Sequence, residues 1–285
     1  MKIRMSPSMS ERIKFLHYDK TGNIGDFLCS PRHYFDFTAN RDTLIVGGGA
    51  SNGFFASRAR RHRANVRVGW GIGQSWRFDS PPGFLAIWIS QLKRRFCYDL
   101  VSTRDPLLSN MKLPLVPCVS VFHPITEIPC GEKVGVFLNA NSSVSGSISD
   151  DTSFLEDAYG KPVIRAINVG EVDKFMEAFR QTELLITNSY HAAYWGLLSG
   201  RRVHVIGYSS KFNSLLALFG FGPERVIAVE RGNVEELERA IHSCPALEPL
   251  QCDDPAGMRS RFRSLNLDFS KKLEEFGIRA SLRVS

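Results

Sequence analysis

The sequence lacks the cysteine and histidine patterns of a zinc or disulfide framework. Its six cysteines stand at positions 29, 97, 118, 130, 244 and 252. No two of them have CxxC spacing, and no group of histidines or carboxylates accompanies them in the sequence. We therefore expect reduced, mostly buried thiols in a cytoplasmic protein that uses no metal ion and no cofactor.

Long apolar stretches are missing as well. The longest, residues 84–89, is far too short to cross a bilayer, and residues 1–15 contain no apolar core of a signal peptide. The GxGxxG pattern of dinucleotide-binding folds is absent, and so is any repeat of fixed period. These absences disfavour a membrane-spanning, secreted, dinucleotide-dependent or solenoid protein.

The composition is that of a globular protein with an excess of positive charge. The chain has 285 residues, of which 43% are hydrophobic and 23% charged, and a formal net charge of +7. Such a charge favours anionic partners. Arginines gather in a predicted helix over residues 56–64, and a second basic group occupies 93–95. These runs indicate either a solvated face or a peripheral contact with an anionic membrane at its inner face; without interleaved aromatic residues they do not favour nucleic acid.

Apolar runs alternate with amphipathic segments along the whole chain, which predicts two βα-repeating domains. We place the boundary in the segment 124–132, so that the domains span residues 1–127 and 128–285. The clearest helices are predicted over 84–96, 171–182 and 257–276, the last long enough to cross back over the first domain. The predicted strands cover residues 14–18, 43–46, 66–70, 100–103, 133–138, 163–167, 184–187, 203–208 and 226–229.

The most informative stretch is LLITNSYHAAYWGLLSG, residues 184–200. It reads as a strand, a polar turn and an apolar helix that ends at Gly200. His191 then falls in the first turn of that helix, just beyond the carboxyl end of a strand, where open α/β sheets bind ligands and helix N-termini favour anions. Asn188 and Ser189 would add donors. The alternative is an ordinary first-turn histidine, satisfied by water or a carbonyl.

Three other turns follow predicted strands of the first half. Asn23, Gly25 and Asp26 form the first. Three glycines at 47–49 form the second, either as a tight corner or with amides facing a ligand oxygen. Gln74 belongs to the third, after Gly71 and Gly73.

Five motifs in this order resemble the polysaccharide pyruvyl transferase family: GNIGD, LIVGGG, STRDPLLS, TNSYHA and GYSSKFNSLLALFG. No single motif is specific, but five in register are fairly specific, and they span roughly residues 14–245. The family histidine falls on His191, and the later family lysine on Lys211. Ser189 stands where one form of the family motif has an arginine, which leaves the binding of the donor carboxylate to Lys211 or another base.

The resemblance implies two Rossmann-like domains that face a cleft, as in GT-B folds. The donor would be phosphoenolpyruvate, and the acceptor two hydroxyls of a sugar in a bacterial exopolysaccharide or cell-surface glycan intermediate, either lipid-linked or an oligosaccharide. We expect His191 as general acid and Asp26 as base, although Asp26 fits a helix-start carboxylate equally well. Arg104 and Asp105 fit a local ion pair better than a catalytic set. The expected substrate-binding residues are Asn188, Ser189, Tyr190, Lys211, Asn23, Gly25, Gly48, Gly49, Gln74 and Asn141.

Two other functions remain open from the sequence. One is a GT-B glycosyltransferase with a nucleotide-sugar donor, although no acidic residue after His191 is placed to hold a ribose. The other is a non-catalytic, glycan-binding relative that kept the fold.

Overall fold

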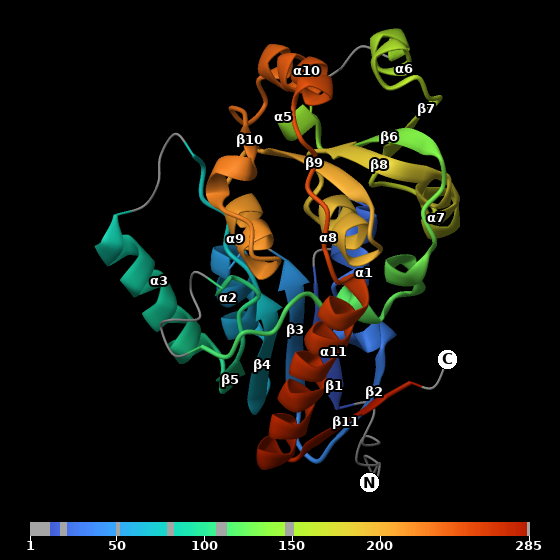
Figure 1. Cartoon of the computed structure of the whole chain (residues 1–285). Coiled ribbons are helices and arrows are strands. Elements are labelled where there is room, and N and C mark those ends of the chain that lie inside the picture. Colours follow the sequence, from blue (N-terminus) through green and yellow to red (C-terminus); the bar gives the residue numbers. More distant parts are fainter. Residues whose placement is uncertain are drawn as a thin grey trace, which may run out of the picture.

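Two parallel β-sheets organise the chain, as the computed structural model in Figure 1 shows. The structure describes residues 12–17, 22–49, 52–78, 83–106, 113–145 and 151–283. One sheet has four strands and comes from the first half of the chain; the other has five and comes from the second half. The predicted α/β class is therefore confirmed, with two sheets that are consistent with two Rossmann-like domains.

The first sheet has the strand order β1-β3-β4-β5, and each neighbouring pair is parallel. Its elements are β1 (Ile13–Leu16), β3 (Thr43–Gly49), β4 (Val66–Ile72) and β5 (Leu100–Val101), with α1 (Ile24–Leu28), α2 (Asn52–Arg61) and α3 (Phe84–Cys97) between them. One prediction about this sheet was wrong. The glycines at 47–49 do not form a turn after β3, because the strand continues through them to Gly49.

The close packing of another segment explains why β3 ends in glycines. A Cβ atom on Gly47 would lie 2.9 Å from the Cα of Ser30, and one on Gly48 would lie 3.1 Å from the Cβ of Cys29. The two glycines therefore leave room for the chain that follows α1 to pack closely on this end of β3.

The second sheet has the order β10-β9-β8-β6-β7, again with parallel pairs. Most of its elements agree with the predictions, because each apolar run there is long and clearly bounded. The bounds are β6 (Lys133–Leu138), α5 (Ser142–Ser145), α6 (Ser153–Tyr159), β7 (Val163–Ile167), α7 (Val172–Arg180), β8 (Thr182–Thr187), α8 (Tyr190–Leu198), β9 (Arg202–Gly207), α9 (Lys211–Leu218), β10 (Ile227–Ala228) and α10 (Val234–Ser243).

The unpredicted elements include the helices α5 and α6 and two strands that form a separate antiparallel pair. These strands are β2 (Phe35–Ala39) and β11 (Ile278–Leu282). Ile278 pairs with Ala39, although the two residues are 239 positions apart in the sequence. The pair joins residues 278–282 to the first half of the chain. The Ser-, Gly- and Asp-rich sequence of residues 142–151 predicts a loop, which is wrong for its first four residues because they form α5; residues 146–150 lie outside the described residues. The sequence also predicts a short helix that starts at 104–106, and its continuation over 107–112 lies outside the described residues.

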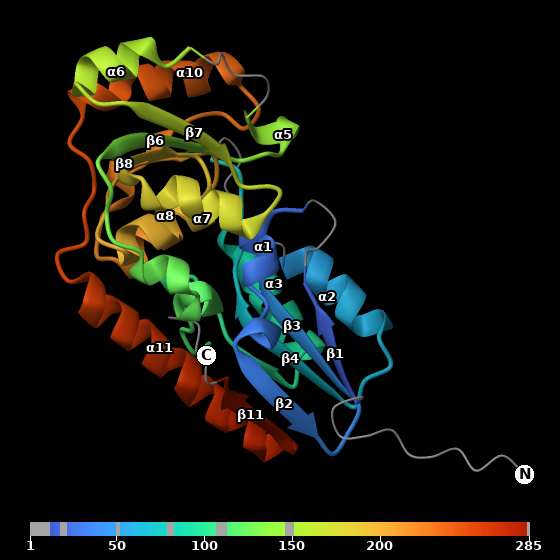
Figure 2. The ribbon, with the colours of Figure 1, turned by 90° about the vertical axis from the view of Figure 1, so that its right-hand side faces the viewer.

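The carboxyl ends of the two sheets meet. Asn23 forms an isolated bridge with Val169, and the Ile24 amide donates to the carbonyl of Asn168 at 2.9 Å. In a second place, the Ser210 amide donates to the carbonyl of Trp76 at 2.8 Å. Figure 2 shows α1 between the first sheet and helices α7 and α8 of the second. The parts of the two halves that follow strand ends therefore form one continuous region.

The long helix α11 (Pro255–Lys272) contacts both halves, as the sequence led us to expect. Its Phe262 ring stacks at 6.1 Å from that of Tyr194, and its Phe269 ring lies 5.1 Å from that of Trp70. Asn266 between them accepts a hydrogen bond from the Trp70 indole at 2.7 Å.

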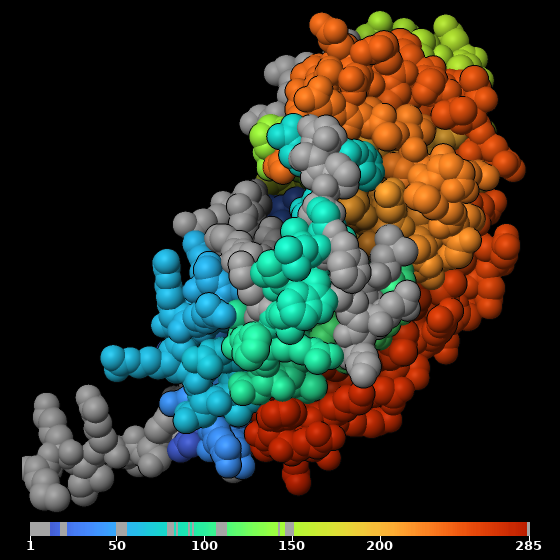
Figure 3. All heavy atoms as spheres, turned by 90° about the vertical axis from the view of Figure 1, so that its left-hand side faces the viewer, coloured from blue at the N-terminus to red at the C-terminus, as the bar shows by residue number. Residues whose placement is uncertain are grey.

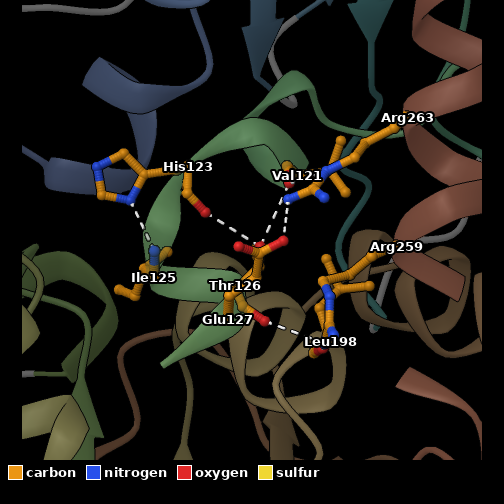
Figure 4. A network of polar contacts seen from close by, with 8 residues as sticks. All are labelled: Val121, His123, Ile125, Thr126, Glu127, Leu198, Arg259 and Arg263. Atoms are coloured by element: carbon orange, nitrogen blue, oxygen red, sulfur yellow. Dashed lines mark hydrogen bonds and ion pairs between the residues drawn. The ribbon is translucent and has the colours of Figure 1, made fainter. Parts of the chain in front are cut away.

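Two arginines of α11 hold the segment between the sheets, which Figure 4 shows from close by. Arg263 donates to the Val121 carbonyl and forms an ion pair of 2.7 Å with Glu127, and Arg259 donates to the carbonyls of Thr126 and Leu198. The predicted domain boundary at 127/128 falls in this segment, between β5 and β6, and stays a prediction.

Candidate functional site

His191 lies in the first turn of α8, as predicted, and its side chain is 5% exposed. The helix starts directly after β8 and the two polar residues Asn188 and Ser189. Gly200, with a φ of 80°, lies just after its end in the left-handed conformation that glycine favours. Every residue of α8 is buried, which explains why this helix is apolar on all sides.

Two thiols surround the imidazole. The Nε2 atom of His191 lies 2.9 Å from Sγ of Cys29 and 3.7 Å from Sγ of Cys118, and the two sulfur atoms are 3.4 Å apart. The prediction of free, mostly buried cysteines is confirmed, since five of the six are buried and none is paired. The spacing of the cysteines in the sequence did not indicate this contact, because His191 is distant from both along the chain.

The two thiols differ in acidity. Burial raises the pKa of the Cys29 thiol, and its hydrogen bond with Cys118 raises it further. Burial alone would also raise the pKa of Cys118, but hydrogen bonds with Cys29 and His191 and the electrostatic influence of His191 and Arg104 bring it well below the usual value. Of the two thiols, Cys118 is therefore the one that loses its proton more readily.

Cys29, Cys118 and His191 could also hold a metal ion. Their ligand atoms all lie within 4.8 Å of one another, and two thiolates with one imidazole suit a soft divalent ion such as Zn²⁺. The sequence contained no hint of this ligand set, because its members come from three separate segments.

Helix α1 covers the other side of the imidazole. A Cβ atom on Gly25 would lie 2.1 Å from Nδ1 of His191 and 2.4 Å from its Cγ, so this position has room only for glycine. Asn23 caps the helix by accepting a hydrogen bond from the Asp26 amide at 3.2 Å. The N-x-GD turn thus builds a short helix whose backbone packs on His191.

Asp26 follows Gly25 in the first turn of α1 and is partly exposed. This position agrees with a carboxylate that stabilises the helix dipole. Its expected role as the base stays a prediction.

Asn188 and Ser189 use their side chains within the protein. Asn188 accepts from the Asn139 amide at 2.8 Å and donates to Ser145 Oγ at 3.0 Å. Ser189 Oγ accepts from the Asn168 side chain at 3.2 Å. These two residues fix the turn before His191, and Asn168, which sequence reasoning missed, links this turn to α1 through its backbone carbonyl.

Arg104 crosses from the first half and lies on the ring of Tyr190, with its Cζ 4.0 Å from the ring centroid. Its side chain is 1% exposed, yet its Nε and Nη1 groups have no hydrogen-bond partner in the described part of the chain. The Tyr190 hydroxyl and Oδ1 of Asp105 have none there either. A Cβ on Gly73 would lie 2.5 Å from the Arg104 Nε atom, so a glycine also makes room for this side chain.

The predicted local ion pair between Arg104 and Asp105 is not formed. Oδ2 of Asp105 instead accepts from the Gln74 amide at 2.6 Å, while the Gln74 side chain binds Ser90. Burial lowers the pKa of Arg104, but the electrostatic influence of the neighbouring Tyr190, Cys29, Cys118 and Asp105 more than compensates, so that the net shift is upward. The guanidinium of Arg104 is therefore buried and stays charged, and its Nε and Nη1 groups have no acceptor in the described residues.

Lys211 begins α9 and lies farther along the same edge of the second sheet. Its ammonium donates to the Tyr208 hydroxyl at 2.6 Å, and the Asn139 side chain also donates to that oxygen, at 3.4 Å. Because the Asn139 amide binds Asn188, a chain of hydrogen bonds links Lys211 to the turn before His191.

The remaining predicted residues fall into two groups. Gly48 is near the cluster, since it packs against Cys29. Asn141 is exposed and accepts from Ser143 in a local turn, and Gly49 ends β3; in the described residues, no contact of either with His191 is found. The structure thus gathers Tyr190, His191 and Gly25 with Arg104 and the two thiols.

The chain was also compared with known proteins and protein families. No curated protein matches the chain. A model of one protein family, described as polysaccharide pyruvyl transferase, matches residues 7–210, which is well over half of the chain. The matched range includes the α1 turn, Arg104 and His191, and it ends one residue before Lys211. The chain therefore belongs to the polysaccharide pyruvyl transferase family, a family of transferases.

Proposed function

We propose that this protein moves the pyruvyl group of phosphoenolpyruvate onto two hydroxyls of one sugar in a bacterial exopolysaccharide or cell-surface glycan intermediate. The products are a cyclic pyruvate ketal and inorganic phosphate. Family membership supports a pyruvyl donor and a polysaccharide acceptor.

The observation that carries the proposal is the buried guanidinium of Arg104. A charged group without acceptors is costly to bury, and phosphoenolpyruvate supplies both a carboxylate and a phosphate that could accept its hydrogen bonds. One form of the family motif has an arginine at the position of Ser189. Arg104 lies on the ring of the next residue, Tyr190, so it can replace that arginine from the first half of the chain.

The reaction needs one proton delivered and two removed. A proton added to the methylene carbon of the donor makes its C2 atom electrophilic, and a sugar hydroxyl attacks C2 and loses its own proton. The C2–O bond to phosphate then breaks, and the second hydroxyl attacks C2 and loses its proton. His191 delivers the first proton in our proposal, and Asp26 accepts one from the sugar.

The surrounding residues suit these roles. The Cys29 thiol, 2.9 Å from Nε2 of His191, can exchange a proton with the imidazole between steps, and a thiolate on Cys118 stabilises positive charge there. Lys211 and the start of α8 would stabilise the departing phosphate. We propose a GT-B-like cleft with the donor on the second domain and the acceptor on the first.

Calorimetric titration with phosphoenolpyruvate, together with phosphate release from a glycan acceptor, tests the proposal. Replacing Arg104 by Gln removes a charge-assisted pair, which should weaken donor binding about 10–100-fold. Replacing His191 by Gln should leave donor binding largely intact and slow phosphate release at least about 100-fold. Circular dichroism at the same temperature checks that each variant is folded.

Lys211→Ala and Lys174→Ala form a matched pair, because Lys174 is an exposed lysine on α7. We expect weaker donor binding in the first variant and no change in the second. Heat from a nucleotide sugar and none from phosphoenolpyruvate would instead identify a glycosyltransferase. Unchanged phosphate release in His191→Gln would remove His191 from the mechanism.

A further inference from the structure

Helix α3 carries its apolar residues on the outside of the molecule. Leu85, Trp88, Ile89 and Phe96 are 66%, 45%, 39% and 79% exposed. Their separations of three, one and seven residues place them on one side of the helix, with the partly exposed Leu92 between them. We call these five residues the α3 stripe. Half of the large exposed hydrophobic side chains in the described part of the chain belong to it.

The inner side of α3 is held to the protein by polar groups. The Arg94 guanidinium is buried and donates to the Ile72 carbonyl at 3.1 Å and to Thr103 Oγ1 at 3.3 Å. One turn earlier, Ser90 binds the side chain of Gln74. The usual arrangement of an amphipathic helix, apolar side inward, is therefore reversed, and the α3 stripe is not part of the protein core.

The positive charge of the protein is concentrated around this helix. Residues 43–98, which include α2 and α3, hold nine of the 36 Lys and Arg residues but only one of the 29 Asp and Glu residues, Asp79. This stretch has a formal charge of +8, whereas the rest of the chain has −1, which together give the +7 of the whole.

We propose that the α3 stripe and the arginines of α2 dock the protein on an anionic lipid bilayer. Figure 3 looks onto this face, with α3 at its centre and α2 beside it. Arg60, Arg61 and Arg63, in and just after α2, are exposed. An apolar helix face with a tryptophan, next to a cluster of arginines, is the composition of helices that lie in the interface of anionic membranes.

A bilayer fits this face better than a protein partner does. A bilayer can bind a protruding helix without a surface of complementary shape, which a protein partner would need. Figure 1 shows α3 at the periphery of the molecule. No helix in the described residues is long and apolar enough to span a membrane, so such docking would be peripheral. The contact would bring the region around Gln74 and Asp105, which α3 holds, close to lipid-linked acceptors.

Sedimentation of the full chain with lipid vesicles tests the proposal without any substrate, so its result is separate from that of the transferase assay. One set of vesicles contains phosphatidylcholine alone, and the other contains phosphatidylcholine and phosphatidylglycerol in equal amounts. We expect binding to the second set and little to the first. Because each arginine near an anionic surface is worth about fivefold in affinity, the triple change of Arg60, Arg61 and Arg63 to Gln should lower affinity about 100-fold.

The apolar part is tested by Trp88→Ser combined with Phe96→Ser, which should lower binding about tenfold or more. Leu247→Ser is the matched control, because Leu247 is as exposed as Trp88 but lies in the second half of the chain. It should bind as the unchanged protein does. Tryptophan emission should shift to the blue on anionic vesicles, and this shift should vanish in Trp88→Phe.

Three results would overturn the proposal. The first is equal binding by the double variant and the Leu247→Ser control. The second is equal binding to neutral and anionic vesicles. The third is a dimer in solution that the double variant dissociates while vesicles are not bound, because the stripe would then be an interface between two copies.

Discussion

The residues around His191 are constrained because they come from other segments of the chain and lie very close to its imidazole. Gly25 packs on one side of the imidazole, and Cys29 and Cys118 approach Nε2. The glycine leaves space for the imidazole, and the Cys29 thiol lies within hydrogen-bond distance of its Nε2 atom. Two predictions follow from these contacts.

Replacing Gly25 by Ala should destabilise the protein, although alanine is favoured over glycine inside helices by about 1 kcal/mol. The new Cβ would lie 2.1 Å from Nδ1 of His191, so either α1 or the imidazole must move. We expect a loss of about 1–3 kcal/mol in the free energy of unfolding, measured with urea, and a loss of transferase activity.

Gly83→Ala is the control for this change. Gly83 caps α3 with a φ of −64°, and a Cβ atom on it would have no neighbour within 4 Å, so alanine fits there. Equal stability of Gly25→Ala and Gly83→Ala would show that α1 can move away from His191 at no cost.

Zn²⁺ should bind the cluster of Cys29, Cys118 and His191 in a one-to-one ratio. Two soft thiolates and an imidazole can each contribute one ligand, and binding should strengthen as pH rises because the thiols must lose protons. Competition with a coloured chelator measures the affinity. Since the metal would occupy Nε2 of His191, we also expect Zn²⁺ to inhibit the transferase.

Serine substitutions locate this binding. Cys29→Ser and Cys118→Ser should each lose it, whereas Cys244→Ser, a buried cysteine elsewhere, should keep it. Unchanged Zn²⁺ binding by Cys118→Ser would assign the metal to another group, such as the exposed Cys130.

At the scale of helices and strands, local signals place the ends of elements well. Asn233 caps α10 by accepting from the Glu236 amide at 3.1 Å, as its sequence pattern predicts. Asn233 and Glu236 also have the spacing of a capping box, in which the glutamate would bind the Asn233 amide, but the Glu236 carboxylate accepts from the Glu230 amide instead, at 2.6 Å. This hydrogen bond holds the chain at Glu230, three residues before the N-cap, against the first turn of α10.

Asn233→Ala should cost about 1 kcal/mol of stability, because it leaves an amide of the first turn without its acceptor. Thermal unfolding followed by circular dichroism measures the change. Thr152→Ala is the control, since Thr152 stands at the same position before α6 but makes no side-chain cap. A cost as large for Thr152 as for Asn233 would contradict the assignment of the cap.

At the scale of the whole molecule, the buried His204 and the partly buried His123 make stability depend on pH. Burial and the nearby Arg202 and Arg225 lower the pKa of His204 from 6.5 to about 4, and burial lowers that of His123 to about 4. Below pH 6.5 these two histidines bind protons in the unfolded chain but not in the folded protein. The contribution of these neutral histidines to the free energy of unfolding is therefore complete above pH 6.5 and is lost as the pH falls toward 4.

We expect the free energy of unfolding to fall by about 1–2 kcal/mol per histidine between pH 7 and pH 5. Urea unfolding at both values measures this loss. His204→Gln should reduce the loss, whatever its effect at pH 7. A variant with the same loss as the unchanged protein would exclude His204 as a source.

Much of the fold could be predicted because it depends on local pattern. The strands β6 and β7 have the predicted bounds, and α8 starts where its polar turn ends, because apolar runs and turn residues act over a few positions. The β2–β11 pair could not be predicted in this way, since neither strand shows which distant segment it will meet.

The sequence by itself therefore determined the α/β class, the place of His191 at a strand end and the resemblance to the family. Tertiary structure alone decided which side chains surround that histidine. Cys118 and Cys29 precede His191 by 73 and 162 positions, and Arg104 comes from the other sheet. Contacts at such separations depend on how the sheets pack, which no pattern of a few residues encodes. For the same reason, only the folded chain shows that α3 turns its apolar side outward.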